Sequence, residues 1–564
     1  MQLKTEQAES IEISKSGPAG TSLPWSAARV QPFLSEVVLS RLILALSMAA
    51  GSFLRIWQIN AMGYNTDEAV YAGQAAAIAG VAGLKDIFPI FRAHPLLFQF
   101  VLSLIYRIQF NDLSGRLLAA VVGLGAVLLT YQIGKTLYGR MPGALAAAIL
   151  ALMPYHVIVS RQVLLDGPMV FFATLSLYML ARFGKSQKME WLYAAGAIMG
   201  LTFLSKETSL ILMGAIYTFL ALAPEIRVRI RDLVIATVLM GLVISPFPLA
   251  LSLAGGSSSG RNYLVWQLFR RPNHEWFFYF QSVPPAIGIF VIIVALLGLA
   301  LLWRARSWRE KLLLSWIIVP VAFFTIWPVK GFQYLLPIAP PLALLAGRVL
   351  GELASRVHRY RLPGAFNRAW TSFAARIFPN TAPNNSMLLR DGTVSIHPLV
   401  SWALTVVIVF SLGFASWQRI QPETSALFLA GTGGVPGGRE AGEWIAKNVP
   451  ASARMMTIGP SMANIIQFYG VRKALGLATS PNPLHRNPSY EPILNPDMQI
   501  RHSELHYLIW DSFSAGRTPF FSEKLMGYVN KYNGRAVHTE TISVKDAQGN
   551  LVNQPVIIIY EVHP

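Results

Sequence analysis

Residues 233–260 read LVIATVLMGLVISPFPLALSLAGGSSSG, without a single Asp, Glu, Lys or Arg. An α-helix needs about 20 such residues to cross the roughly 30 Å hydrocarbon core of a bilayer. Residues 276–303 and 392–418 are two further charge-free runs of this kind. Repeated runs of this length predict a protein that crosses a membrane many times.

Shorter runs extend the same pattern through the first two thirds of the chain. Charge-free cores occur at residues 117–134, 141–160, 167–181, 191–205, 208–224, 312–329 and 331–347. A first hydrophobic helix is expected at residues 37–57, after a polar tail longer than the usual start of a cleavable signal peptide. The total is about eleven transmembrane helices.

Composition excludes several other classes of protein. The 564 residues are 53% hydrophobic and only 13% charged, too few charges for a single soluble globule or a basic disordered tail. The net charge of +19 comes from Lys and Arg placed between apolar runs, so no nucleic-acid partner is expected. The absence of cysteine excludes disulfides, thiolate metal sites, iron–sulfur clusters and cysteine nucleophiles.

The distribution of basic residues predicts the topology. Residues 94–110 form an apolar segment that could be a twelfth span. A span here would place the basic loops that follow it outside the cell, so we expect the segment to lie along the membrane surface as an amphipathic helix. The N-terminal tail and one set of loops then carry 22 Lys and Arg against 10 Asp and Glu, and the opposite loops carry 10 against 7. Since basic loops stay in the cytoplasm, we expect the N-terminus inside and the C-terminus outside.

The C-terminal quarter has a different composition. A Gly- and Pro-rich linker at 431–438 leads into a stretch of ordinary charge density, with a helix expected at 439–448 and strands at 455–458, 506–510 and 555–560. We therefore divide the chain into a cytoplasmic tail (1–36), a membrane module (37–417) and a small extracytoplasmic α/β domain (418–564).

The predicted outer face gathers a short list of ionisable residues. Polar groups at the edge of an apolar bundle raise the expectation of a functional cavity. This set offers carboxylates for a general base and cations for a phosphate; its candidate residues are Asp67, Glu68, His94, Arg161, Asp166, Lys206, Arg270, Arg271, His274 and Lys330.

Several of these candidates also have another interpretation. Asp67, Glu68 and Asp166 stand where acids cap helices, and Lys206 with Glu207 resembles an ordinary charged helix end. His274 lies in an aromatic loop that suits packing at the membrane interface. Arg270 and Arg271 could bind lipid head groups. The residues alone leave these alternatives open.

Five motifs in order resemble the GT-C glycosyltransferases, chiefly the protein O-mannosyltransferases and the lipid A aminoarabinose transferases. The resemblance covers residues 37–347. It rests on Tyr64-Asn-Thr-Asp67-Glu68-Ala-Val-Tyr71, His94-Pro95-Leu96, Ser160-Arg161 through Asp166-Gly-Pro168, Gly200 through Lys206-Glu207, and Gln333-Tyr334-Leu-Leu-Pro337.

The resemblance implies a membrane enzyme that moves a sugar from a polyprenyl-phosphate carrier to a protein, lipid or glycan acceptor outside the cell membrane. It also implies juxtamembrane helices in the first external loop. Asp67 matches the position of the family's catalytic base and Asp166 that of its second acid. Tyr334 and the cations would then bind substrate, and direct displacement would invert the anomeric centre.

One departure concerns metal binding. The lipid A transferases carry Glu-Lys before the Pro where this chain has Ala93-His94, so we assign no metal ligands. No cofactor is expected, with a divalent cation left as an alternative. A transporter or lipid flippase is a competing hypothesis, although such proteins usually place charges at mid-membrane depth. A receptor whose C-terminal domain binds partners is another.

Overall fold

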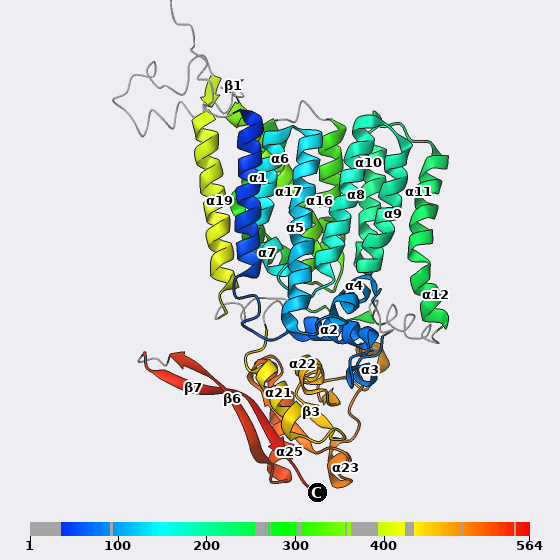
Figure 1. Ribbon diagram of the computed structural model, residues 1–564, viewed down its shortest axis with the longest axis vertical. Coiled ribbons are helices and arrows are strands. Elements are labelled where there is room, and N and C mark those ends of the chain that lie inside the picture. The colour runs from blue at the N-terminus through cyan, green and yellow to red at the C-terminus, as the bar shows by residue number, and fades with distance from the viewer. Residues whose placement is uncertain are drawn as a thin grey trace, which may run out of the picture.

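The computed structural model describes residues 35–90, 94–253, 266, 269–270, 272–301, 307–355, 358–361, 393–396, 398–422, 434–487, 489–545 and 549–564. A bundle of long helices makes up the larger part of the molecule, and a smaller α/β domain lies at one end of it (Figure 1). The short helices of the first loop lie between these two parts. The predicted architecture, a helical membrane module with a C-terminal α/β domain, is confirmed.

The bundle contains most of the helices and one short hairpin. Its elements are α1 (Glu36–Ile56), α5 (Asp112–Leu137), α6 (Arg140–Leu152), α7 (Pro154–Val159), α8 (Asp166–Ser186), α9 (Met189–Ser205), η1 (Glu207–Leu210), α10 (Ile211–Leu222), α11 (Ile230–Ile244), α12 (Pro246–Leu253), α14 (Phe278–Ile287), α15 (Ile289–Leu301), α16 (Trp308–Ile326), η3 (Phe332–Ile338), α17 (Ala339–Ser355), β1 (His358–Arg361), β2 (Thr393–Ile396) and α19 (Pro398–Ile420).

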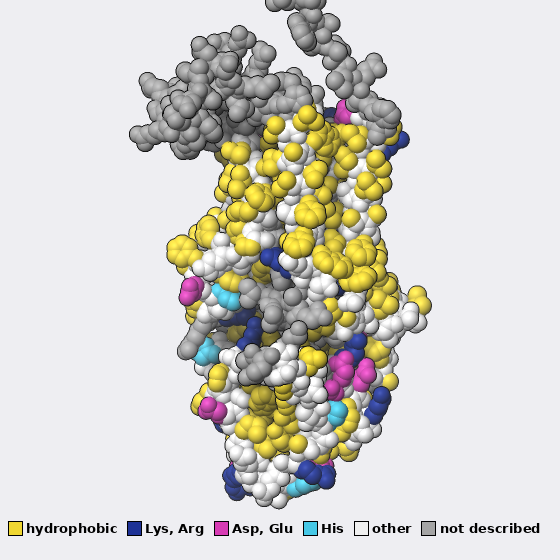
Figure 2. All heavy atoms as spheres, turned by 90° about the vertical axis from the view of Figure 1, so that its left-hand side faces the viewer, with side chains coloured by type: hydrophobic (Ala, Val, Ile, Leu, Met, Phe, Trp, Pro, Cys, Tyr) yellow, Lys and Arg dark blue, Asp and Glu magenta, His cyan; other side chains and the backbone are white. Residues whose placement is uncertain are grey.

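Six described helices are long and apolar enough to cross a membrane, and a bent pair would make a seventh. The helices α6, α9, α10 and α16 lie beside them in the bundle (Figure 1). Large apolar side chains such as Leu46, Val406 and Phe410 are exposed on the bundle, and Figure 2 shows hydrophobic side chains covering much of its surface. The protein is therefore a multi-pass membrane protein, and the count of eleven spans stays a prediction.

Residues 276–303 do not form the single straight helix that their lack of charge predicted. They form α14 and α15, which meet at an angle of 95°. Gly288 lies between them with a φ of 99°, a conformation that favours glycine, and Pro284 and Pro285 lie in the last turn of the preceding helix. Apolar composition predicted the segment correctly and missed the break.

The bundle helices approach closely where they carry glycine. A Cβ atom on Gly143 of α6 would lie 2.7 Å from the carbonyl oxygen of Tyr131 in α5, and one on Gly347 of α17 would lie 2.6 Å from the backbone nitrogen of Ala146. Small residues of this kind let helix backbones pack directly in a membrane.

The first loop contains α2 (Thr66–Ala79), α3 (Leu84–Ile87) and α4 (Leu97–Tyr106). The 10 residues of α4 make a helix of about 15 Å, half the thickness of the hydrocarbon core. In Figure 1 these helices lie under the end of the bundle. The prediction of juxtamembrane helices here is confirmed.

The C-terminal domain is a mixed five-stranded sheet with helices. Its strand order is β4-β3-β5-β7-β6, with β3 parallel to β4 and β5, and β7 antiparallel to β5 and β6. The elements are α21 (Gly438–Asn448), β3 (Met455–Thr457), α22 (Pro460–Gly470), β4 (Ala474–Gly476), η4 (Pro483–His485), α23 (Pro496–Arg501), β5 (Tyr507–Asp511), α24 (Ser512–Arg517), α25 (Pro519–Lys531), β6 (Arg535–Lys545) and β7 (Leu551–Glu561).

The two ends of the bundle differ. The hairpin β1–β2 lies at the end of the bundle where α1 begins (Figure 1). The C-terminal domain lies at the other end, against the first loop: the side-chain amide of Asn464 donates to the Thr66 hydroxyl at 3.1 Å. The first loop and the C-terminal domain therefore share one side of the bundle.

Candidate functional site

Asp67 stands in the first turn of α2, where a capping box fixes the backbone. The side-chain oxygen of Asn65 accepts hydrogen bonds from the backbone nitrogens of Asp67 and Glu68, each at 3.0 Å. The Glu68 carboxylate in turn accepts from the Asn65 backbone nitrogen at 3.1 Å. Among the described residues, no side chain or backbone group hydrogen-bonds to the Asp67 carboxylate, which is half-buried.

Glu68 is fully buried and held from several sides. Its two oxygens accept from the guanidinium of Arg116 at 2.9 and 2.7 Å, and one also accepts from the Val163 backbone nitrogen at 3.0 Å. A carboxylate so fully engaged has no free lone pair for a substrate proton. These contacts fit a structural role for Glu68, which joins α2 to α5, and its catalytic role stays a prediction.

Asp166 and Lys206 form a buried ion pair. The Lys206 ammonium donates to both oxygens of Asp166 at 2.8 Å. The same ammonium lies over the ring of Tyr334, 5.0 Å from its centroid. The structure thus brings together three residues that the motifs placed in separate loops.

His94 pairs with the acid that follows Lys206. Its Nδ1 lies 2.9 Å from a Glu207 carboxylate oxygen, and its ring meets Tyr71 edge-on at 5.9 Å between centroids. Lys206, Asp166 and His94 all act electrostatically on Asp67. We call Asp67, His94, Asp166, Lys206, Glu207 and Tyr334 the Asp67 cluster.

The surroundings alter the acidity of Asp67. Burial raises the pKa of its carboxyl above the usual range for aspartate; the positive charge of Lys206 opposes this rise, and the nearby Asp166 adds to it. A carboxylate with a raised pKa is a stronger base than a solvated one. Asp67 therefore has the character of a proton acceptor rather than of a salt-bridge partner.

The remaining cations lie around this cluster in different ways. Arg270 lies over the Trp266 ring at 4.7 Å and is close enough to act electrostatically on Tyr334. The Lys330 ammonium donates to the carbonyls of Thr325 and Trp327 at 2.9 and 3.0 Å. Lys330 thus holds its own loop, and Arg271 lies outside the described residues.

His274 is exposed. Its ring stacks on that of Phe278 with 4.0 Å between centroids, as the packing interpretation of the aromatic loop expected. Nothing in these contacts gives it a chemical role.

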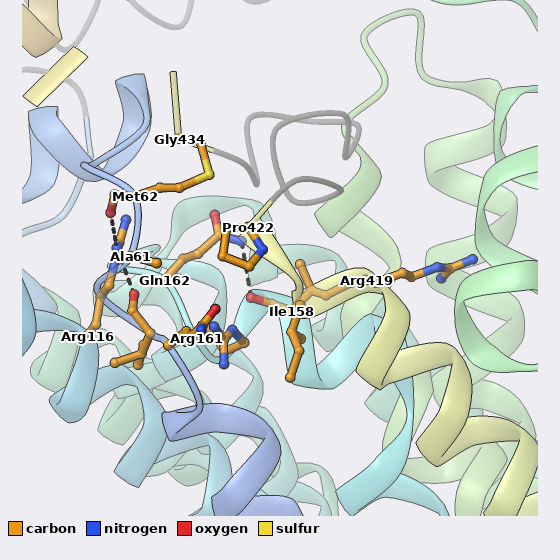
Figure 3. Close-up of a pocket in the computed structure, with 12 residues that line it drawn as sticks. Ala61, Met62, Arg116, Ile158, Arg161, Gln162, Arg419, Pro422 and Gly434 are labelled. Carbon is orange, nitrogen blue, oxygen red and sulfur yellow. Dashed lines mark hydrogen bonds between the residues drawn. The ribbon is translucent and has the colours of Figure 1, made fainter. Parts of the chain in front are cut away.

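Arg161 lies apart from the Asp67 cluster. Its guanidinium donates to the carbonyls of Leu54 and Trp57 at 2.7 and 2.8 Å, where α1 ends. Together with Arg116 and Arg419 it lines a small pocket beneath Met62 (Figure 3). Arg161 thus makes a structural contact with the end of α1, and its expected contact with substrate stays a prediction.

Sequence reasoning missed the buried residues that support the cluster, Arg116 above all. Arg116 directly precedes the charge-free run 117–134, so it was counted only as an outer-loop charge. Its partner Glu68 lies 48 residues earlier. A charged residue directly beside an apolar run indicates a possible buried ion pair, although the sequence does not show which residue is its partner.

The described residues contain no group of three or more His, Asp or Glu side chains placed to hold a metal ion. His94 and Glu207 supply two possible ligands. Binding of a divalent cation therefore stays an untested alternative.

Comparison with known proteins finds relatives among the glycosyltransferases. Residues 93–250 match the family described as dolichyl-phosphate-mannose-protein mannosyltransferase. The undecaprenyl phosphate-α-4-amino-4-deoxy-L-arabinose arabinosyl transferase 1 of Pseudomonas fluorescens is 30% identical over 263 residues, 43% of this chain and 46% of the relative. The enzyme of the same name from Serratia proteamaculans is 37% identical over 148 residues, 22% of this chain and 26% of the relative. The chain thus spans less than half the length of these curated relatives.

The fold has a match along almost the whole chain. ArnT from Cupriavidus metallidurans in the apo state superposes with a TM-score of 0.61 at 14% identity, covering 93% of this chain and 98% of ArnT. The same protein bound to undecaprenyl phosphate gives a TM-score of 0.58 at 15% identity, with the same coverage. At this identity the likeness shows the fold. The family match over residues 93–250 and the ordered motifs agree with a similarity to the GT-C glycosyltransferases.

Proposed function

We propose that the protein is an inverting glycosyltransferase that takes a sugar from a polyprenyl-phosphate carrier, with Asp67 as the general base. The observation that carries this proposal is the Asp67 cluster: a half-buried carboxylate with a raised pKa, beside Lys206 and His94 and near Arg270. The names of the relatives, which contain undecaprenyl phosphate and dolichyl-phosphate-mannose, support a lipid-phosphate sugar donor.

The proposed step balances with these groups. An acceptor hydroxyl oxygen attacks the anomeric carbon, and its proton passes to the Asp67 carboxylate. The bond from the anomeric carbon to the phosphate oxygen breaks, and its electron pair leaves with the polyprenyl phosphate. Attack from the face opposite the leaving group inverts the anomeric centre.

The cations have a matching task in this step. The departing phosphate gains one negative charge, which Lys206 and Arg270 are placed to stabilise. Asp166 holds the Lys206 ammonium at 2.8 Å from both oxygens, so its proposed role is to orient that cation and keep it protonated. His94, held by Glu207, is proposed to contact the donor phosphate or the acceptor.

We propose that this site and the C-terminal domain face the outside of the cell membrane. The support is the excess of Lys and Arg in the loops assigned to the opposite side. The acceptor is then an extracytoplasmic protein, lipid or glycan. A transporter or flippase is not favoured, because the matches are to transferases and the candidate charges gather at one end of the bundle.

The test is the variant Asp67→Asn, in membranes of a strain that lacks the native gene. The donors are polyprenyl phosphate carrying mannose or 4-amino-4-deoxy-arabinose, the sugars in the names of the matched proteins. Mass spectrometry of envelope lipids, proteins and glycans, with and without the gene, identifies the product. General-base catalysis is worth about 10²- to 10⁴-fold, and we expect a rate loss in this range.

The matched control is Asp86→Asn. Asp86 is an exposed acid in α3 of the same loop, and its loss should leave transfer unchanged. Full transfer by Asp67→Asn at normal expression would refute the proposed mechanism. Lipid or solute movement in liposomes that survives Asp67→Asn, without sugar transfer, would favour the transporter.

A further inference from the structure

Asp67 is carried by an irregular segment, residues 57–65, that joins α1 to α2. We call it the strap. Its backbone carbonyls are bound from the bundle side by Arg116, whose guanidinium donates to Ile59 at 2.8 Å, Met62 at 2.7 Å and Gly63 at 2.9 Å. The same guanidinium binds Glu68, so one buried side chain fixes both the strap and the first turn of α2.

The C-terminal domain binds the strap from the other side. Arg439, in the first turn of α21, donates to the Met62 carbonyl at 2.9 Å and to the side-chain oxygen of Asn60 at 3.1 Å. The hydroxyl of Tyr469, in α22, accepts from the backbone nitrogen of Tyr64 at 2.7 Å. That nitrogen lies three residues before Asp67.

Asp112 connects these two sides. One of its carboxylate oxygens accepts from the Tyr469 hydroxyl and forms an ion pair with Arg439 at 2.9 Å. Its backbone carbonyl accepts from the Tyr64 hydroxyl at 3.1 Å. Asp112 belongs to the first turn of α5, so the contact joins a membrane helix, the strap and the C-terminal domain.

The packing at this contact leaves little room. A Cβ atom on Gly63 would lie 2.8 Å from the Cβ of Arg439, and one on Gly434 would lie 2.5 Å from the Gly63 carbonyl oxygen. Beside it, Asn464 of α22 donates to the hydroxyl of Thr66, the residue before Asp67. The strap is therefore held by two guanidinium donors, Arg116 and Arg439, and by one hydroxyl acceptor, Tyr469, which come from the two domains.

We infer that the C-terminal domain completes the catalytic site: Arg439 and Tyr469 are positioning residues that hold the strap and so set the place of the Asp67 carboxylate. This inference rests on the proposed function of Asp67. The residues contact no reacting atom. Their effect passes through the Tyr64 amide and the Met62 carbonyl to the first turn of α2.

A passive attachment of the domain predicts a different behaviour. If Arg439 and Tyr469 only tether the domain, their removal would lower stability in proportion to the bonds lost and leave turnover per folded molecule unchanged. If they position Asp67, turnover falls while donor affinity stays, since displacing a reacting group by about 1 Å can cost about 100-fold in rate.

The experiment compares Tyr469→Phe and Arg439→Lys with matched controls in the same domain. Tyr532→Phe removes a hydroxyl that donates to Asp497 at 2.7 Å, and Arg535→Lys alters an ion pair with Glu561 at 2.8 Å. Both controls lie away from the strap. Initial rates are measured on the full-length proteins in detergent, with the donor that the wild-type protein uses and membranes of the deletion strain as acceptor.

We expect kcat of Tyr469→Phe to fall about 10- to 100-fold, with an unchanged KM for the donor and a shifted acid limb of the pH–rate profile. Tyr532→Phe and Arg535→Lys should match the wild type. Equal kcat for Tyr469→Phe and Tyr532→Phe, with Asp67→Asn inactive, overturns this inference alone. An active Asp67→Asn overturns the proposed function and this inference with it.

Discussion

Asp67 and Glu68 are neighbouring acids with different surroundings. Both follow the Asn65 cap, but Glu68 points into the protein onto Arg116 and Val163. Asp67 faces Lys206, His94 and Asp166 without a hydrogen-bond partner among the described residues. One step along a helix turns a side chain by about 100°. This turn is enough to leave the Asp67 carboxylate available for chemistry while Glu68 makes structural contacts.

The raised pKa of Asp67 has a consequence for stability. Burial makes the ionised carboxylate less favourable in the folded chain than in the unfolded one. The free-energy cost of burying the ionised carboxylate is absent when the pH is below the pKa of aspartate in the unfolded chain, about 3.9. It grows as the pH rises towards the pKa of Asp67 in the folded chain and is constant above that pKa. We therefore expect Asp67→Asn to raise the midpoint of thermal unfolding at pH 7 and to lose this advantage near pH 4.

The measurement is thermal unfolding of the purified variants in detergent at the two pH values. Asp86→Asn, at an exposed site in the same loop, should match the wild type at both. A lower midpoint for Asp67→Asn at pH 7 would mean that its carboxylate stabilises the fold, contrary to the burial argument.

The role of a residue could be predicted from sequence only where the residue and its neighbours along the chain form a recognisable motif. Asp67, Asp166 and Lys206 lie in local motifs at helix ends, and the structure brings these three together. The roles of Arg116 and Arg439 depend on partners 48 and more than 300 residues away. No local sequence pattern shows such pairings. The partners of Arg161, Leu54 and Trp57, are also more than 100 residues away, so its contact with α1 could not be predicted from the motif around it.

The helix α2 begins with a capping box that has a counterpart at the start of α16. Ser307 caps α16 and Glu310 closes that box, at 3.0 Å from the Ser307 backbone nitrogen. An N-cap is worth about 1 kcal/mol. We expect Asn65→Ala and Ser307→Ala to destabilise the protein by about this amount each, and only Asn65→Ala to lower kcat, because its cap orients Asp67.

Thermal unfolding and initial rates on the two variants check this expectation. The comparison separates the contribution of an N-cap to protein stability from its contribution to kcat through the position of Asp67. An equal kcat for both variants would show that the cap at Asn65 serves the helix alone.

Helices and strands of the C-terminal domain could be predicted where their hydrophobic residues follow a clear periodic pattern. The expected helix at 439–448 and strands at 455–458, 506–510 and 555–560 correspond to α21, β3, β5 and β7. The three-residue β4 was missed because so short a strand carries no alternation, and β6 because its residues are mostly exposed or half-buried. The break at Gly288 was missed because charge counting ignores backbone conformation.

The molecule as a whole has two unlike ends of its helix bundle. Because the sequence contains no cysteine, each end can be labelled separately at an introduced cysteine. Single cysteines can be introduced at Lys85 in the first loop, Lys524 in the C-terminal domain and Ser186 at the end of α8, all exposed. In spheroplasts, a membrane-impermeant maleimide should label Lys85→Cys and Lys524→Cys. Ser186→Cys should react only after permeabilisation.

The labelling pattern tests the orientation on its own. The reverse pattern would place the Asp67 cluster in the cytoplasm and leave its chemistry unchanged. Labelling of Lys85→Cys and Lys524→Cys on different sides would contradict the contacts between the first loop and the C-terminal domain.

The contact between Tyr64 and Tyr469 joins residues 405 positions apart. During synthesis the strap leaves the ribosome long before Arg439 and Tyr469, which bind it from the C-terminal domain. At about 5–20 residues per second, Asp67 waits tens of seconds for Arg439 and Tyr469. If Arg439 and Tyr469 position Asp67 as we infer, a chain that stops before α21 carries every residue of the Asp67 cluster in an unfinished site. We then expect a nascent chain to gain its full activity only after α22 has been made.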